Sequence, residues 1–209
     1  YSTNGINWTE AGTNALPVAT YSHRSLVYDG KMWIIGGITT GGVYTQKVYY
    51  STNGSSWIEA GTNALPVAVR YHSSLVYDGK MWVIGGETTG GVLQRKVYYS
   101  TNGSSWTEAG TDALQVATSG HASVVYDNKM WVIEGFTSGG VTQKIYYSTD
   151  GISWTEAGTN ALPVAKDAIS ALVYDGKMWV MGGSTGGQKI YYSTNGTSWT
   201  EAGTNALPA

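Results

Sequence analysis

The chain has 209 residues, of which 12% are charged, and its formal net charge at pH 7 is −2. It contains no cysteine, which excludes disulfide frameworks and thiolate chemistry, and no run of Lys or Arg that would bind a phosphate backbone. Its apolar runs are far shorter than the roughly 20 residues that span a bilayer, so we expect no nucleic-acid partner and no membrane insertion.

A repeated stretch organises the chain. Copies of the pattern Ser-Thr-Asn/Asp-Gly-x-x-Trp begin at Ser2, Ser51, Ser100, Ser148 and Ser193, with spacings of 49, 49, 48 and 45 residues. Periods of about 20 to 50 residues are typical of architectures built from stacked repeats. The fold class therefore depends on what one repeat forms.

Four short apolar or aromatic runs make up the first full repeat and predict four strands. In chain order they are residues 25–28, 31–37, 47–50 and 56–60. Asp29 and Gly30 separate the first two runs, and Asp-Gly favours a type I′ hairpin because Gly adopts positive φ without steric cost. The Ser-Thr-Asn-Gly stretch predicts a second tight turn, between the third and fourth runs. Helical periodicity appears nowhere.

Four antiparallel strands per repeat, stacked by repetition, form the blades of a β-propeller, so the predicted fold class is all-β. The chain is predicted to be a single domain over residues 1–209, or a segment of one, with complete blades at about 20–60, 69–109, 118–157 and 166–202. One blade cannot bury both of its faces, so neighbouring blades must cover it. Nine tryptophans, five in the fourth runs and four in the second runs, are expected to pack between blades.

The residues of the second repeat resemble those of a known family. The stretch RYHSSLVYDGKMWVIGG, residues 70–86, followed by KVYYSTNGSSW, residues 96–106, is similar to the kelch repeat, with its His, double glycine, aromatic pair and spaced tryptophan. The similarity covers essentially the whole chain and is closest to the bacterial kelch-like variety. The fourth repeat departs from the pattern, because Ile169 stands where His is expected.

The number of repeated strands does not close a ring. Five copies of the fourth run accompany four copies of the first two runs, which leaves residues 1–15 as an orphan fourth strand. An unpaired strand edge is a template for pairing with another chain. We therefore expect either a segment of a larger array or a homo-oligomer in which the orphan strand completes a neighbour's sheet.

Two segments differ between the repeats, whereas the turns hardly change. One segment precedes the first run and the other links the second and third runs, so both are expected on one rim of the propeller. Binding residues concentrate on loops that a rigid scaffold holds, and the candidate ligand-binding residues on this rim are Tyr21, Arg24, Tyr44, Arg70, Tyr71, Arg95 and Phe136. The alternative is that these loops are the least constrained positions and drifted after duplication.

Three histidines, His23, His72 and His121, occupy one equivalent position and could in principle offer a three-histidine metal site. The resemblance implies instead a polar contact that ties each blade to its neighbour, so we predict no metal and no cofactor. We predict no catalytic residues either. Kelch-type copper radical oxidases need a cysteine, the sialidase-like turn is structural, and the Gly pairs lack the helix that follows a phosphate loop.

The predicted function is a non-catalytic kelch-type scaffold that binds a protein or other ligand through its variable loops. Two alternatives stay open: a glycan-binding, lectin-like propeller, and an architectural, designed or fibre-forming repeat whose only role is assembly. A lectin is expected to repeat its site in every blade, and this rim differs between blades, which favours a protein ligand over a small glycan. The sequence leaves the cellular location open, with an extracellular or cell-surface location favoured.

Overall fold

The computed structural model describes residues 1–13, 15–133, 135–159, 161–184, 187–203 and 206. All regular structure in this part of the chain is β, and four of its sheets contain four strands each. Neighbouring strands in these sheets are antiparallel. The predicted all-β propeller with four-stranded antiparallel blades is thus confirmed.

The blades are numbered in chain order. Blade one comprises β2 (Arg24–Tyr28), β3 (Lys31–Ile35), β5 (Val48–Ser51) and β6 (Ile58–Glu59). Blade two comprises β8 (Ser73–Tyr77), β9 (Lys80–Ile84), β12 (Val97–Ser100) and β13 (Thr107–Glu108). Blade three comprises β14 (Ala122–Tyr126), β15 (Lys129–Ile133), β18 (Ile145–Ser148) and β19 (Thr155–Glu156). Blade four comprises β20 (Ile169–Tyr174), β21 (Lys177–Gly182), β22 (Ile190–Ser193) and β23 (Thr200–Glu201).

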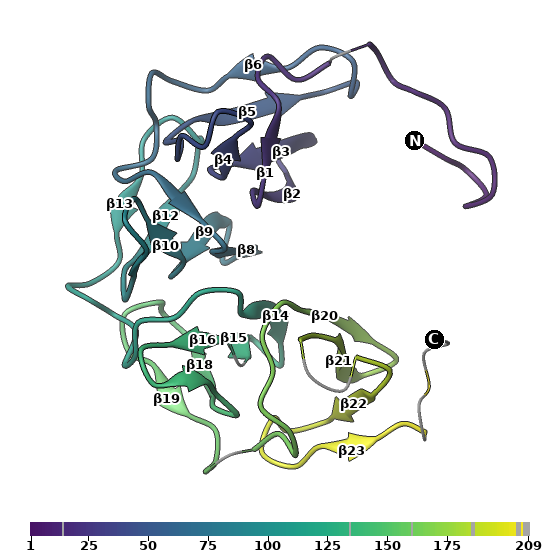
Figure 1. Cartoon of the computed structure of the whole chain (residues 1–209), viewed down its shortest axis with the longest axis vertical. Coiled ribbons are helices and arrows are strands. Elements are labelled where there is room, and N and C mark those ends of the chain that lie inside the picture. The colour runs from purple at the N-terminus through teal and green to yellow at the C-terminus, as the bar shows by residue number, and fades with distance from the viewer. Residues whose placement is uncertain (14, 134, 160, 185–186, 204–205, 207–209) are drawn as a thin grey trace.

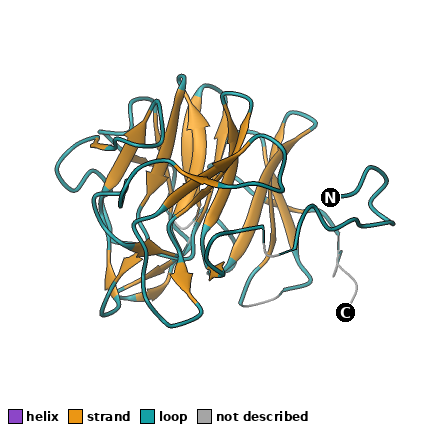
Figure 2. Ribbon diagram, turned by 90° about the horizontal axis from the view of Figure 1, so that it is seen from above, coloured by secondary structure: helices purple, strands orange, loops and turns teal. Residues whose placement is uncertain are grey.

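The four blades form an open arc (Figure 1). Their first strands, β2, β8, β14 and β20, make its inner wall, and each of them lies beside the next. The view from above shows long strands next to one another across the molecule (Figure 2). The arc is open between blade one and blade four, and the N-terminus lies on that side.

The core lies between consecutive blades, because side chains along a strand alternate between the two faces of a sheet. Trp33 and Ile35 of β3 share a buried cluster with Met81 and Val83 of β9. Equivalent clusters join blade two to blade three and blade three to blade four. The second-run tryptophans of blades one to three therefore pack between blades, as predicted.

Both predicted turns are formed. In the first turn, Asp29 and Gly30 have φ of 50° and 66°, the positive values that both central residues of a type I′ turn need. In the second turn, the Ser51 hydroxyl accepts the N–H of Gly54 at 2.8 Å. The same bond recurs at the same length in the other repeats. These bonds within each turn explain why its sequence hardly varies.

The fourth strand predicted within residues 1–15 is not formed in the described part of that segment. Tyr1 and Thr9 exchange two main-chain hydrogen bonds of 2.7 and 2.9 Å, so the segment folds into a small hairpin. A fourth strand needs a third strand beside it, and this segment holds only the last two residues of that strand, Tyr1 and Ser2. The hairpin stands away from the arc on its open side (Figure 1).

A tyrosine at the end of each first strand ties its blade to the next one. The hydroxyl donates at 2.7–2.8 Å to a carbonyl in the next blade's first turn, Tyr28 to Gly79, Tyr77 to Asn128 and Tyr126 to Gly176. A second carbonyl of that blade, from Thr101, Thr149 or Thr194, lies 3.1–3.3 Å from the same oxygen. Among the described residues, Tyr174 of blade four has no such neighbour, and it is 69% exposed.

Removing one of these hydroxyls should weaken the contact between two blades. We expect Tyr77→Phe to lower the free energy of unfolding by about 0.5–1.5 kcal/mol, because a hydrogen bond between two blades is lost. Denaturant titration measures the loss. Tyr174→Phe is the matched control and should leave stability unchanged, so equal losses in the two variants would contradict this role of Tyr77.

Candidate functional site

The two variable segments of a repeat pair with each other. Arg24 is the Cα partner of Ile35, so the segments before β2 and after β3 leave blade one at the same end. There, three small sheets form: β1 (Thr20–Tyr21) with β4 (Ile38–Thr39), β10 (Glu87–Thr88) with β7 (Val69–Arg70) and β11 (Val92–Leu93), and β16 (Phe136–Thr137) with β17 (Gly140–Val141). In blade three, Ser119 bridges to Phe136. We call this end of the blades the variable rim.

Arg70 is the centre of a side-chain cluster on the variable rim. Its guanidinium lies 2.8 Å from Glu87 Oε1. It also lies 4.8 and 4.7 Å from the ring centroids of Tyr44 and Tyr71, within the range of cation–π attraction. Tyr44, from blade one, donates to the same Glu87 oxygen at 2.7 Å. Burial and this hydrogen bond raise the pKa of Tyr44. The cluster therefore joins the rims of two blades.

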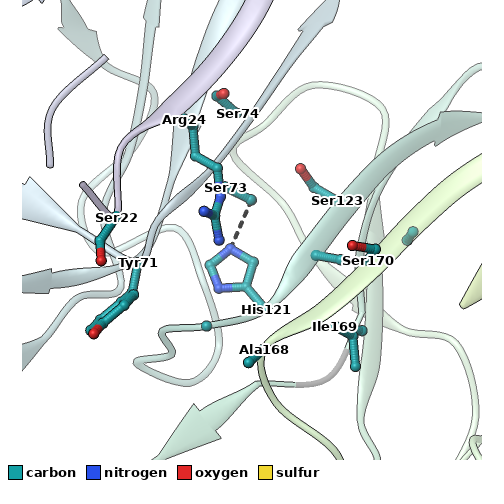
Figure 3. Close-up of a pocket in the computed structure, with 13 residues that line it drawn as sticks. Ser22, Arg24, Tyr71, Ser73, Ser74, His121, Ser123, Ala168, Ile169 and Ser170 are labelled. Atoms are coloured by element: carbon teal, nitrogen blue, oxygen red, sulfur yellow. Dashed lines mark hydrogen bonds between the residues drawn. The ribbon is translucent and has the colours of Figure 1, made fainter. Parts of the chain in front are cut away.

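A hollow of about 510 Å³ lies against the inner wall of the arc, where the first strands begin (Figure 3). All four blades line it, through Ser22, Arg24, Tyr71, Ser73, Ser74, Gly120, His121, Ala122, Ser123, Ala168, Ile169, Ser170 and Ala171. Tyr71 belongs both to this lining and to the Arg70 cluster, so the two are continuous. We call this cavity the channel hollow.

Arg24 is the cationic side chain of the channel hollow. Its guanidinium points toward His121 (Figure 3), and Nη1 donates to the carbonyl of His23 at 3.3 Å. Burial lowers the pKa of Arg24, although a guanidinium keeps its charge in proteins. None of the ion pairs among the described residues includes Arg24. A half-buried guanidinium of this kind is suited to an anion that comes from outside the chain.

Reasoning from the sequence missed the serines of the channel hollow. Ser73 Oγ lies 2.8 Å from His121 Nε2. The buried hydroxyls of Ser74 and Ser123 have no hydrogen-bond partner among the described residues. Buried hydroxyls normally have one, so these two are spare polar groups near Arg24. The sequence feature that could have identified them is a serine that recurs two residues after each histidine, as at Ser74 and Ser123.

Two of the histidines, His72 and His121, are buried, and His121 connects neighbouring blades. The bond from His121 to Ser73 of blade two is the predicted polar contact. His72 is completely buried, and neither of its ring nitrogens has a hydrogen-bond partner in the described part of the chain. Burial, followed by the charge of Arg24, lowers the pKa of His72 and of His121 to about 3. Among the described residues, no three His, Cys, Asp or Glu side chains are grouped to hold a metal ion.

The other candidate residues divide between the rim and the scaffold. Tyr21 and Phe136 lie exposed on the rims of blades one and three. Arg95 donates from Nε to a carbonyl of the next connecting segment at 2.7 Å. Gln46 makes the equivalent bond in blade one at 2.8 Å. Arg95 therefore makes a repeated structural contact, and we leave it out of the candidate site.

Comparison with known protein families defines the class of this protein. The KLHDC2/KLHL20/DRC7 Kelch-repeats domain matches residues 1–135, and the DUF6242 beta propeller domain matches residues 111–208. The sheets and these matches together define a β-propeller built from kelch repeats. Because the first match covers more than half of the chain, the chain belongs to the Kelch-repeat domains. No curated protein matches it.

Membership of this family gives the function in coarse terms. Kelch-repeat propellers are commonly non-catalytic scaffolds that bind other proteins.

No helix in the described residues is long and apolar enough to cross a membrane.

Proposed function

We propose that this protein is a non-catalytic binding scaffold that holds an anionic group of a protein ligand in the channel hollow, while the variable rim contacts the rest of that ligand. The observation that carries the proposal is the Arg24 guanidinium, which is half-buried and forms no ion pair among the described residues. A charge held away from water without a partner costs free energy, and an incoming carboxylate or phosphate offsets that cost.

The polar lining of the channel hollow supports an anionic ligand group. A carboxylate accepts two parallel N–H bonds from a guanidinium, which is a strong and directional pairing. The spare hydroxyls of Ser74 and Ser123 are polar groups of the same cavity. The volume of about 510 Å³ is within the usual range of ligand pockets.

The variable rim supports a protein as the source of that group. Arg70 lies against Tyr44 and Tyr71, and Tyr21 and Phe136 are exposed on the rims of blades one and three. Arg and aromatic side chains are enriched at protein interfaces and among their most important contacts. These rim residues differ from blade to blade, which favours one irregular ligand surface over a glycan site repeated in each blade.

The test is selection of a displayed random peptide library against the immobilised chain, followed by calorimetry on the enriched peptides. We expect those peptides to share an acidic residue. Arg24→Ser, which introduces the residue that blades two and four have at this position, should weaken their binding about 10- to 100-fold. Arg95→Gln is the matched control, because it removes the same charge and introduces the residue of the other blades.

Two outcomes would count against the proposal. One is enrichment of peptides without acidic residues, and the other is equal binding by wild type and Arg24→Ser. Specific binding on a glycan array by the wild-type chain, together with no peptide enrichment, would instead favour the lectin-like alternative.

A further inference from the structure

We propose that the two open faces of the arc are complementary halves of one interface. The open face of blade four in one copy of the chain packs on the open face of blade one in a second copy. This inference is independent of the ligand proposal. It rests on the three interfaces inside the chain, which repeat the same contacts, and on the two end faces, which present the two halves of those contacts without a neighbour.

The open face of blade four presents the side chains that blades one to three bury against their next neighbour. Leu172 is 42% exposed, whereas the equivalent Leu75 and Val124 are 7% exposed. Tyr174 has none of the carbonyl acceptors of the equivalent tyrosines within the part of the chain that the structure describes. Trp179 is partly exposed, although the equivalent tryptophans of the other blades are buried. This face therefore carries an apolar surface and a hydrogen-bond donor ready for another blade.

The open face of blade one presents the other half of the interface between consecutive blades. Met32 is 37% exposed, whereas the equivalent Met81, Met130 and Met178 are completely buried against the preceding blade. Inside the chain, the indole of a preceding blade lies directly over the glycine of the second turn, as Trp33 lies over Gly103. No indole lies over Gly54, the equivalent glycine of blade one.

The two faces match because both come from the same repeat. In each internal interface, a tyrosine hydroxyl meets a carbonyl of the first turn and an indole covers the glycine of the second turn. Tyr174 and Trp179 of one copy would meet Gly30 and Gly54 of another copy in the same way. Blade one and blade four lie on opposite sides of the opening in the arc (Figure 1), so one chain does not satisfy both faces. Such a head-to-tail contact joins unlike surfaces and forms either a closed ring or a chain of copies.

Part of the N-terminal segment lies where a preceding blade would place its outermost strand. A Cβ placed on Gly12 would lie 3.4 Å from Ser55. A Cβ placed on Gly61 would lie in the same way 3.3 Å from Ser104. The segment therefore follows the path of the outermost strand of a preceding blade. Residues 1–10 repeat residues 192–201 except at two positions. The docked blade would therefore carry one of these two segments as its outer strand, and the other would leave that place.

The experiment uses two variants that block one face each, measured by sedimentation velocity of the 209-residue chain at about 1 to 100 µM. Leu172→Glu and Met32→Lys place a charge on an open face. Each should weaken self-association about 100-fold or more, because a charge buried without a partner is strongly unfavourable. Val43→Glu, on an exposed loop of the variable rim, is the matched control and should associate like wild type.

Mixing the two variants distinguishes a head-to-tail interface from other associations. Leu172→Glu keeps an intact first blade and Met32→Lys keeps an intact fourth blade, so an equimolar mixture should form dimers although each variant alone does not. Thermal unfolding of each variant verifies that it is folded. A wild-type chain that sediments as a monomer at every concentration would overturn the proposal, and so would variants that associate as strongly as wild type.

Discussion

Gly103→Ala is expected to lower the free energy of unfolding by about 3–5 kcal/mol, whereas Gly54→Ala should cost only about 1–2 kcal/mol. The two glycines occupy the same turn position and have nearly the same φ, +76° and +78°, so both substitutions carry the penalty of a left-handed conformation. A Cβ on Gly103 would also overlap the ring of Trp33, which is buried and has little room to move. A Cβ on Gly54 would meet only Met32 and Ala11, at 3.4 and 3.6 Å.

Denaturant titration of both variants measures the difference. Gly151 and Gly196 have the same relation to Trp82 and Trp131 as Gly103 has to Trp33, and alanine there should behave like Gly103→Ala. Equal losses of stability in Gly54→Ala and Gly103→Ala would show that backbone strain alone accounts for the effect of replacing this glycine. They would contradict a contribution from packing of the indole between blades.

Lowering the pH from 7 to 5 is expected to reduce the free energy of unfolding by about 4 kcal/mol. His72 and His121 have a pKa of about 3 in the folded chain, against an ordinary value of 6.5. Between these values the unfolded chain binds more protons than the folded chain, so stability rises with pH. The contribution of the two neutral rings is fully present above pH 6.5 and is lost as the pH falls toward 3.

Unfolding titrations at a series of pH values measure this dependence. His72→Ile introduces the residue that blade four has at the equivalent position, Ile169, and should reduce the loss between pH 7 and 5 to about half. A wild-type stability that does not change over this interval would contradict the burial of two neutral histidines.

Much of the fold could be predicted from the sequence because its determinants are local. Asp29 and Gly30 specify a hairpin through their own backbone conformations, and Ser51 closes the next turn by a bond to a residue three positions on. The period of the Ser-Thr-Asn-Gly motif shows that such units repeat. One local prediction was wrong. The described residues of the segment 1–15 carry the fourth-strand sequence without forming that strand, because a strand depends on the neighbour it pairs with.

The candidate site was predictable only in outline. Comparison of the repeats placed Tyr44, Arg70 and Tyr71 on one rim, and these three do meet in the structure. The same comparison included Arg95, whose contact in the structure is the one that Gln46 makes in blade one.

What stabilises the turns and the strand order is contained in short stretches of sequence, so the sequence sufficed to predict a propeller of kelch repeats. Which side chains are left without a partner was decided only when the blades packed together. Arg24 and Tyr174 illustrate this. The cavity around Arg24 is lined by residues of the other three blades, and Tyr174 is exposed because no further blade packs on it among the described residues. Such contacts depend on how whole sheets stack, and no stretch of one repeat specifies them.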